Sequence, residues 1–282
     1  MKSKLVQVVT WTLIAAMALT GLYVGFASPP VPQTPAAKQP VTTAPPPVAS
    51  APAPRPAPRP ARAPEQARPV TLEHVDRPEG LGAPGTPVLV GLHGRGDMAV
   101  GFAGLAAPIG GEGHNEIGLA WHGLQGPYRF GSGASWFTGD RKQPVGLEAS
   151  VAAVSAELRA LRKQGRKVGL FGFSQGCMMI AHLVLTAPDA IDGAICIGGS
   201  AIGTLPTPTA GAKLPPVLLV AGTADAMVPI EEQRGLATVL QAAGVTTQTL
   251  EHPGGHRIPG EHVPAMRAWV RRHLSGGVPT AR

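Results

Sequence analysis

The pentapeptide Gly-Phe-Ser-Gln-Gly at residues 172–176 has the residue types and spacing to present a reactive serine. It follows an apolar run, 167–171, that predicts a buried strand, and it precedes a run, 177–187, that predicts a helix ended by Pro188. Such a sequence at a strand-to-helix junction is a nucleophile elbow, whose strained turn exposes the serine at a helix N-terminus. A Cβ at either glycine is expected to collide with the neighbouring strand or helix. We therefore predict that Ser174 is a nucleophile and not a harmless serine in a glycine-rich turn.

A serine hydroxyl needs a base, and the base needs an acid that orients it. Behind an elbow, the acid and the base follow the serine along the chain. The run 216–221 predicts a strand with Asp225 in the turn at its carboxyl end, and the run 246–252 predicts the next strand, with His256 in the loop that follows. Because parallel strands place their ligand sites at their carboxyl ends, we expect Ser174, Asp225 and His256 to meet at one edge of a sheet.

Three other histidines compete with His256 for the role of base. His252 falls in or at the end of a predicted strand, and His262 comes just before the last predicted helix. His182 lies two turns along the helix after the elbow and is expected to pack against its neighbours. His256 follows two glycines in a loop, which favours an exposed position. An aspartate in a turn is usually a local hydrogen-bonding group, but the strand-end position of Asp225 favours the role of acid.

The oxyanion that forms when a serine attacks a carbonyl group needs two hydrogen-bond donors. We expect one to be the backbone N–H of Gln175. The other is expected from the loop His-Gly-Arg-Gly-Asp, residues 93–97, with the N–H of Arg95 as the candidate. Three further residues are candidates for contacts with the substrate: His93, Gly94 and Trp136. A phosphate-binding loop is the alternative at 93–97, but neither the Gly-Lys-Ser/Thr ending nor a Gly-x-Gly-x-x-Gly pattern is present.

Strand-like and helix-like runs alternate through residues 71–282. Strands are expected at 87–92, 116–121, 167–171, 193–197, 216–221 and 246–252. Helices are expected at 146–164, 177–187, 231–243 and 263–274. This alternation predicts one α/β catalytic domain over 71–282, with a mostly parallel sheet and helices on both faces.

Five motifs in this order resemble the phospholipase/carboxylesterase family, which includes bacterial carboxylesterases and acyl-protein thioesterases. They lie at residues 92–97, 135–137, 172–176, 224–229 and 255–256. The resemblance covers about 85–274 and implies an α/β-hydrolase fold, no cofactor and hydrolysis of carboxylic esters or thioesters through an acyl-enzyme. It also implies Ser174, Asp225 and His256 as the catalytic triad, with a small or lipid-like ester as substrate.

Three positions depart from the family pattern, one of them Phe137, which is followed by Thr-Gly-Asp at 138–140 and not directly by the usual Asp. Arg95 stands where an apolar residue is common, and it would place a cation beside the acyl or leaving group. Cys177 stands where a glycine is usual. Two other function classes remain open, namely a non-catalytic binding protein tethered in the cell envelope and a peptidase or polyester depolymerase on the same fold. The intact set of motifs argues against a non-catalytic protein.

The cysteine content and the distribution of charge bear on three features: disulfides, metal-ligand motifs and nucleic-acid binding. The only two cysteines, Cys177 and Cys196, are expected to be buried free thiols and not a disulfide, and no metal-ligand spacing is present. The net charge is +7, but the basic surplus lies in residues 1–70, which carry seven Lys or Arg and one Glu. The remainder is close to neutral, and the arginines are not interleaved with aromatic residues, so a nucleic-acid partner is not expected.

The first 70 residues predict a membrane segment and a linker. Residues 5–27 are uncharged and mostly apolar, and about 23 residues suffice to span a bilayer. Lysines precede them and predict a cytoplasmic N-terminus with the rest outside. An anchor over 1–28 is preferred to a cleaved signal peptide, which would release a secreted protein, and no cysteine is present to attach a lipid. Residues 29–69 hold 15 of the 31 prolines, so 29–70 are expected to form a disordered, extended linker.

Overall fold

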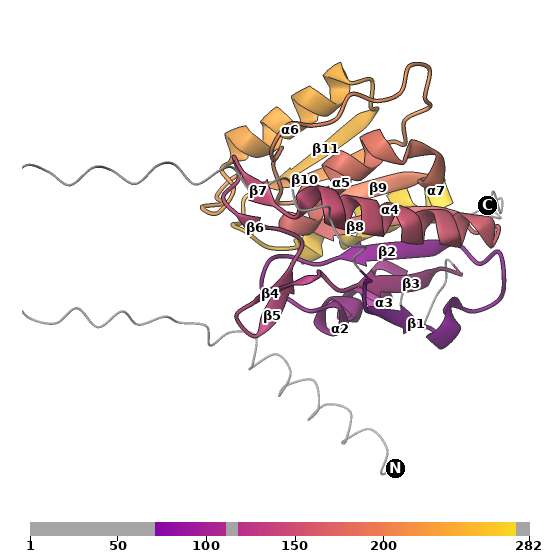
Figure 1. The fold of residues 1–282 in the computed structure, drawn as a ribbon. Coiled ribbons are helices and arrows are strands. Elements are labelled where there is room, and N and C mark those ends of the chain that lie inside the picture. The colour runs from indigo at the N-terminus through magenta and orange to yellow at the C-terminus, as the bar shows by residue number, and fades with distance from the viewer. Residues whose placement is uncertain (1–70, 111–117, 275–282) are drawn as a thin grey trace, which may run out of the picture. The chain divides into compact units, whose positions relative to one another are not determined.

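The computed structural model describes residues 71–110 and 118–274, and these residues belong to one unit of the chain, Arg62–Arg282. A seven-stranded sheet lies at its centre, in the order β1-β3-β2-β8-β9-β10-β11 (Figure 1). Strand β1 (His74–Arg77) runs antiparallel to β3 at one edge, and all other neighbours in this sheet are parallel. The predicted mostly parallel sheet is confirmed.

Apolar runs form the strands of the sheet interior because helices cover both of its faces. Every residue of β2, β3, β9 and β10 is buried, as is all of β8 except its last residue. The bounds are β2 (Val88–Leu92), β3 (Ala120–Leu124), β8 (Val168–Phe173), β9 (Gly193–Ile197), β10 (Val217–Gly222) and β11 (Thr247–His252).

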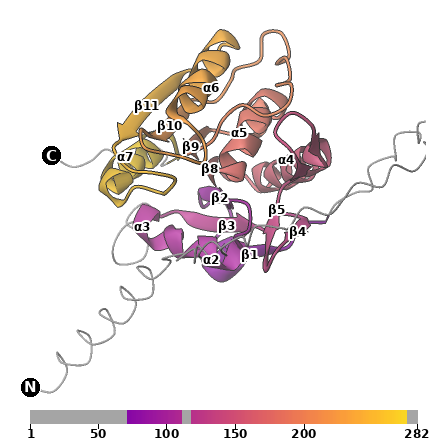
Figure 2. The same cartoon turned by 90° about the vertical axis from the view of Figure 1, so that its left-hand side faces the viewer.

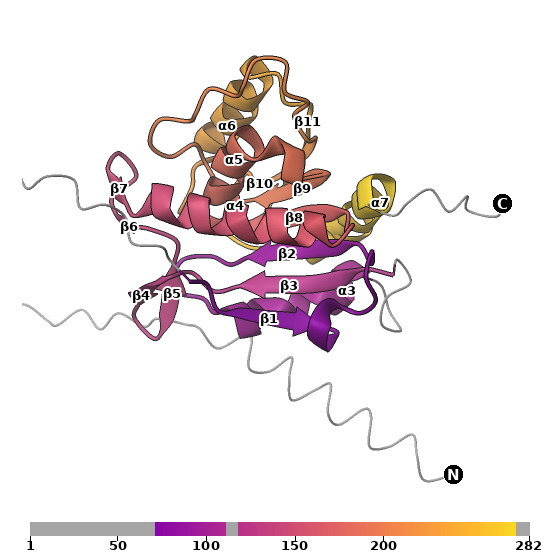
Figure 3. The same cartoon turned by 45° about the vertical axis from the view of Figure 1, so that its right-hand side comes forward.

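Two apolar cores lie on opposite faces of the sheet. Helices α4 (Leu147–Lys163), α5 (Gln175–Thr186) and α6 (Ile230–Ala242) contribute to one core. Helix α7 (Val263–Leu274) and the short α2 (Ala99–Phe102) and α3 (Ala106–Gly110) lie on the other face. Figures 2 and 3 show this arrangement, with α7 on the far side of the strands from α4 and α5. Alternate residues of one strand, such as Val88 and Leu89, enter different cores.

Short elements complete the described residues. Two hairpins follow β3: β4 (Tyr128–Phe130) with β5 (Gly133–Ser135), and β6 (Thr138–Gly139) with β7 (Pro144–Val145). Four 3-10 turns are η1 (Glu79–Leu81), η2 (Ala103–Leu105), η3 (Pro188–Ala190) and η4 (Gly260–His262).

One predicted strand is displaced. We expected a strand over 116–121, whereas β3 begins at Ala120 and ends at Leu124. Gly118 has a φ of 63°, which breaks the extended backbone of a regular strand, and pairing with β2 starts after it. The predicted anchor over 5–27 and the proline-rich linker lie outside the described residues. Within 71–110 and 118–274, no helix is both long and apolar enough to cross a membrane.

The prediction of two free thiols is wrong. Cys177, in the first turn of α5, and Cys196, in β9, form a disulfide with their Cα atoms 4.6 Å apart. Both residues are about 1% exposed. The side chains face each other because α5 packs directly on β9, and the linear sequence does not show that facing.

Candidate active site

The elbow predicted at residues 172–176 joins β8 to α5. Ser174 has φ 54° and ψ −115°, and α5 begins at the next residue. A non-glycine residue in this region is strained, and such strain persists where the surroundings determine the backbone. Here the N–H of Ser174 donates to the carbonyl oxygen of Ile197 at 2.8 Å. The turn therefore presents the serine side chain at the carboxyl end of the sheet.

The two elbow glycines allow the turn to pack closely. A Cβ at Gly172 would lie 2.6 Å from the carbonyl group of Gly176, in the first turn of α5. A Cβ at Gly176 would lie 1.9 Å from the carbonyl oxygen of Leu92, at the end of β2. Real Cβ atoms essentially never approach this closely. The expected collisions with the neighbouring helix and strand are confirmed.

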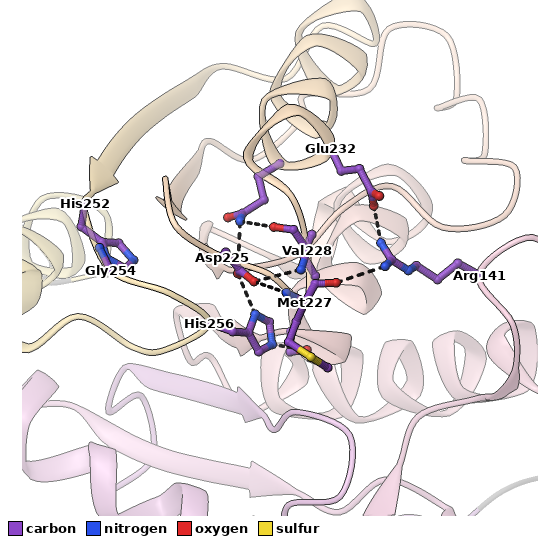
Figure 4. A network of polar contacts seen from close by, with 10 residues as sticks. Arg141, Asp225, Met227, Val228, Glu232, His252, Gly254 and His256 are labelled. Carbon is purple, nitrogen blue, oxygen red and sulfur yellow. Dashed lines mark hydrogen bonds and ion pairs between the residues drawn. The ribbon is translucent and has the colours of Figure 1, made fainter. Parts of the chain in front are cut away.

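Three side chains expected to meet at this edge form a hydrogen-bonded chain. Nε2 of His256 lies 2.9 Å from Oγ of Ser174. Nδ1 of His256 lies 2.7 Å from Oδ2 of Asp225 (Figure 4). Ser174 follows β8, Asp225 follows β10 and His256 follows β11. Since a carboxylate only accepts, Nδ1–H donates to Asp225, and Nε2 is left to accept from the serine hydroxyl. This arrangement can take up the proton of Ser174.

The carboxylate of Asp225 is buried and fully hydrogen-bonded. Its Oδ1 accepts from the backbone N–H groups of Met227 and Val228 at 2.8 and 2.9 Å (Figure 4). Its Oδ2 also accepts from Nε2 of Gln233 at 3.2 Å. Burial by itself raises the pKa of Asp225, but the hydrogen bonds from Val228, His256 and Met227 together lower it. The residue is therefore ionised at neutral pH.

A surface arginine braces the loop that carries Asp225. Arg141 forms an ion pair with Glu232 in α6 and donates to the carbonyl oxygen of Met227 at 3.1 Å (Figure 4). Both charged side chains are exposed, so the pair adds little stability by itself. Its position fixes the backbone whose N–H groups bind Asp225.

The competing histidines make other contacts. His252 ends β11, and its Nδ1 accepts from the N–H of Gly254 at 3.1 Å, apart from the Ser174 chain (Figure 4). Burial, followed by the charge of Arg257, lowers the pKa of His252. Rings of His262 and His182 lie against backbone carbonyl oxygens at 3.2 and 2.9 Å, and His182 is buried in α5 as expected.

Two backbone amides lie at the elbow and in the loop 93–97 that runs beside it. Across residues 71–110 and 118–274, the N–H groups of Arg95 and Gln175 have no hydrogen-bond acceptor in the protein. A Cβ at Gly94 would lie 3.5 Å from the Cβ of Ser174, so the loop runs directly beside the serine. Two free donors near a serine can stabilise negative charge on a bound carbonyl oxygen.

Buried side chains support this loop. His93 is 0% exposed, and its Nε2 accepts from the N–H of Gly126 at 3.0 Å, so Nδ1 carries the proton and donates to the carbonyl oxygen of Gly94 at 2.7 Å. Burial lowers the pKa of His93, which keeps the ring neutral. Nε1 of Trp136, also 0% exposed, donates to the carbonyl oxygen of His93 at 2.9 Å.

The side chain of Gln175 links this support to the elbow. Its Oε1 accepts from the N–H of Trp136 at 3.0 Å, and its Nε2 donates to the carbonyl oxygen of Phe137 at 3.2 Å. Sequence reasoning assigned only the backbone of Gln175 and missed this role. His93, Gly94 and Trp136 were expected to contact the substrate, but the side chains of His93 and Trp136 lie beneath the loop and are inaccessible. Only Gly94 borders the serine.

An exposed arginine lies beside these amides. The guanidinium carbon of Arg95 lies 4.8 Å from the ring centre of Phe130, which is 46% exposed. No described carboxylate lies within ion-pair distance of Arg95. The rim of the site thus carries a cation without an acidic partner, held over an aromatic ring.

Comparison with known proteins supports the predicted resemblance. Residues 130–266 match the family described as serine hydrolase (FSH1), and this segment includes Ser174, Asp225 and His256 but not the loop 93–97. The chain is 32% identical to an esterase, OVCA2, of Danio rerio over 134 residues, or 43% of this chain and 54% of that protein. It is 32% identical to a probable carboxylesterase of Oryza sativa subsp. japonica over 107 residues, or 36% and 40%. The chain spans about half the length of these curated relatives or less.

Solved structures show the same fold. A carboxylesterase from Mesorhizobium loti superposes with a TM-score of 0.60 at 22% identity, over 71% of this chain and 95% of that one. A carboxylesterase of Bacillus cereus gives 0.58 at 19% identity, over 72% and 94%. The predicted resemblance to serine hydrolases of the carboxylesterase kind is confirmed.

Proposed function

We propose that this protein is a serine hydrolase that cleaves carboxylic esters or thioesters through an acyl-enzyme. The observation that carries the proposal is the continuous hydrogen-bonded chain from Ser174 through His256 to Asp225, at 2.9 and 2.7 Å. The free amides of Arg95 and Gln175 and the similarity to esterases support it. Ser174, His256 and Asp225 would then act as nucleophile, base and orienting acid.

In the proposed first step, Oγ of Ser174 attacks the carbonyl carbon while Nε2 of His256 takes the hydroxyl proton. The N–H groups of Arg95 and Gln175 bind the oxyanion. Collapse of this intermediate breaks the bond to the alcohol or thiol, which leaves with the proton from His256. Water then attacks the acyl-enzyme, His256 takes its proton, and the acid is released as Ser174 regains a proton.

In this proposal Asp225 keeps the proton of the imidazole on Nδ1 and stabilises the imidazolium that forms. Its lowered pKa supports that role, since the carboxylate stays ionised over the working range of a neutral imidazole. His93, Trp136 and the side chain of Gln175 are assigned to holding the oxyanion donors in place, because they are buried beneath them.

The unpaired cation at the rim suggests a substrate charge. Arg95 supplies both a candidate oxyanion amide and, on the same residue, a guanidinium group without an acidic partner in the described structure. We infer that esters with a negative charge on the acyl or leaving group are preferred to neutral esters of the same size. Ester and thioester remain equal candidates for the scissile bond.

The test is covalent labelling and turnover of the full chain. Ser174→Ala should lose labelling by a fluorophosphonate probe and at least 10³-fold in turnover of p-nitrophenyl butyrate, as for loss of a triad nucleophile. Ser155→Ala is a matched control, since Ser155 is a buried serine of α4 away from the site. Labelling or turnover that survives in Ser174→Ala would refute the proposal, and a wild type without either would favour the binding-protein alternative.

We also propose that the catalytic domain works outside the cytoplasm, held by residues 5–27. The disulfide between Cys177 and Cys196 supports this, because disulfides persist in oxidising compartments. Protease treatment of intact cells should then remove the domain from the membrane fraction, and the intact mass should include residues 1–28. A protected domain would contradict the proposal, and a soluble, shortened chain would favour the secreted alternative.

A further inference from the structure

A cluster of two histidines and one aspartate lies at the sheet edge that β1 forms. His74 and Asp76 point to the same side of β1 because side chains alternate along a strand, and His122 in β3 pairs directly with Asp76. Nδ1 of His122 lies 2.7 Å from Oδ1 of Asp76, and Nε2 of His74 lies 3.9 Å from its Oδ2. One donor atom from each side chain lies within 4.8 Å of the other two.

This cluster is separate from the proposed active site. In the sheet order, β1 stands at the edge and β8, which leads to Ser174, is its third neighbour, beyond β3 and β2. The mechanism above uses none of the three residues. Any ligand at the cluster would therefore bind independently of the serine chemistry.

The donor atoms have the chemistry of a transition-metal site. Two imidazoles and one carboxylate form a set that Zn²⁺ commonly binds, with water in a fourth position. His122 and Asp76 are already in contact, and the three donor atoms lie within 4.8 Å of one another. The side chain of His122 is 5% exposed, that of Asp76 is 15% exposed and that of His74 is 53% exposed. The cluster can therefore be reached from solvent.

The ring of His122 is buried, and Asp76 is its one hydrogen-bond partner among the described residues. The ring of His74 also lies 4.9 Å from that of His122, at the open side of the pair.

We propose that His74, Asp76 and His122 bind a divalent transition metal, with Zn²⁺ as the best fit, and that the metal clamps strand β1 onto β3. Tetrahedral zinc with bonds of about 2.0–2.1 Å needs donor atoms about 3.3 Å apart. The 2.7 Å contact between His122 and Asp76 therefore opens slightly as zinc replaces the shared proton. The exposed His74 turns inward to close its 3.9 Å gap to Asp76.

Helix α4 supplies a further negative charge near the cluster. Glu157 is on the helix that packs over this face, and its carboxylate interacts electrostatically with His122. An acidic neighbour favours a cation at this edge over an anion. It also distinguishes the cluster from the rim of the active site, where the unpaired charge is the positive Arg95.

The test measures Zn²⁺ binding by the tag-free full chain in competition with a chromogenic chelator. We expect about one zinc per chain in the wild type, with at least a 10-fold loss of affinity in His74→Ala and in Asp76→Asn. His74 is exposed, so its replacement should leave the fold intact. His262→Ala is the matched control, a histidine outside the cluster, and should bind zinc as the wild type does.

A second measurement tests the clamp. Zinc should raise the thermal midpoint of the wild type, because a ligand that binds only the folded state stabilises it, and should slow amide exchange in β1. His74→Ala should show neither effect. Zinc binding that is unchanged in His74→Ala, absent from the wild type, or lost instead in His256→Ala would overturn the proposal.

Discussion

The two sides of Ser174 are held in different ways. On the side of the base, Asp225 and His256 sit on loops, and four hydrogen bonds to the Asp225 carboxylate fix their geometry. On the oxyanion side, the proposed working groups are backbone amides, and fully buried side chains hold them from below. In the proposed mechanism, side chains perform the chemistry on the first side and the backbone supports them, whereas on the second side the backbone performs the chemistry and side chains support it.

This contrast shows where sequence changes should have their effect. A side chain that takes part in proton transfer cannot be replaced without loss of the step. A backbone donor tolerates replacement of its own side chain but depends on neighbours such as Trp136, which never meet the substrate. The following predictions separate the two sides, from the largest expected effect to the smallest.

Asp225→Asn should lower kcat by about 10⁴-fold, because an amide would favour the wrong imidazole tautomer and no longer stabilise the imidazolium. KM should change little. Steady-state kinetics on p-nitrophenyl butyrate measure the effect, and Asp189→Asn, a change at an exposed aspartate, is the control. A loss below tenfold would mean that Asp225 is not the acid of the chain.

Trp136→Phe should lower kcat by about 10²-fold, because the loop that carries the Arg95 amide loses its hydrogen bond to the indole. Trp121→Phe is a matched control, since Nε1 of Trp121 is buried and has no hydrogen-bond partner among the described residues. Equal losses in both variants would attribute the effect to aromatic packing and would refute the oxyanion-side assignment.

Arg95→Met should reduce the preference for anionic over neutral esters by about 10-fold, the effect of roughly 1.4 kcal/mol. The backbone amide of residue 95 remains, so kcat on the neutral ester should stay within a factor of about three. The ratio of kcat/KM for a hemisuccinate ester and its methyl ester measures the preference. An unchanged ratio in the variant would show that Arg95 does not contribute to substrate selection.

Acidification should lower the free energy of unfolding in two separate pH ranges, one set by His93 on the oxyanion side and one set by Asp225 on the side of the base. The pKa of His93 is lowered from 6.5 in the folded state, so the unfolded chain gains the proton first and stability falls as pH drops below 6.5. The pKa of Asp225 is lowered from 3.8, so its contribution is present above that value and is lost as pH falls further. Unfolding free energies from urea titrations at several pH values test both windows.

One variant for each residue shows which residue is responsible for which pH range. His93→Gln should flatten the pH dependence between 7 and 5 by at most about 1.4 kcal/mol per pH unit, the effect of one proton. Asp225→Asn should alter only the acidic window. An unchanged slope between pH 7 and 5 in His93→Gln would show that other buried histidines dominate there.

Much of the fold could be predicted because the central strands are buried on both faces. Continuous apolar runs indicated β8, β9 and β10 to within two residues. Strand β1, with the sequence His-Val-Asp-Arg, has no such pattern, and only its pairing with β3 makes it a strand. The same long-range pairing assembles the candidate metal cluster, so its ligands showed no recognisable spacing.

The candidate active site could be predicted only where a residue's place depends on local sequence. Ser174, Asp225 and His256 each follow a predicted strand, and the structure brings them together. The bonds from the Gln175 side chain span 38 and 39 residues and depend on how a distant loop packs. The disulfide likewise depends on α5 facing β9.

The left-handed backbone of Ser174 lowers the stability of the protein at the residue on which the proposed activity depends. Glycine adopts such a conformation without the strain that a serine carries, so the proposed nucleophile is not the residue that best suits the turn. Selection for thermal stability alone would favour glycine at position 174. The selected proteins would be stable but inactive. Engineering for thermal tolerance should therefore always include a screen for activity.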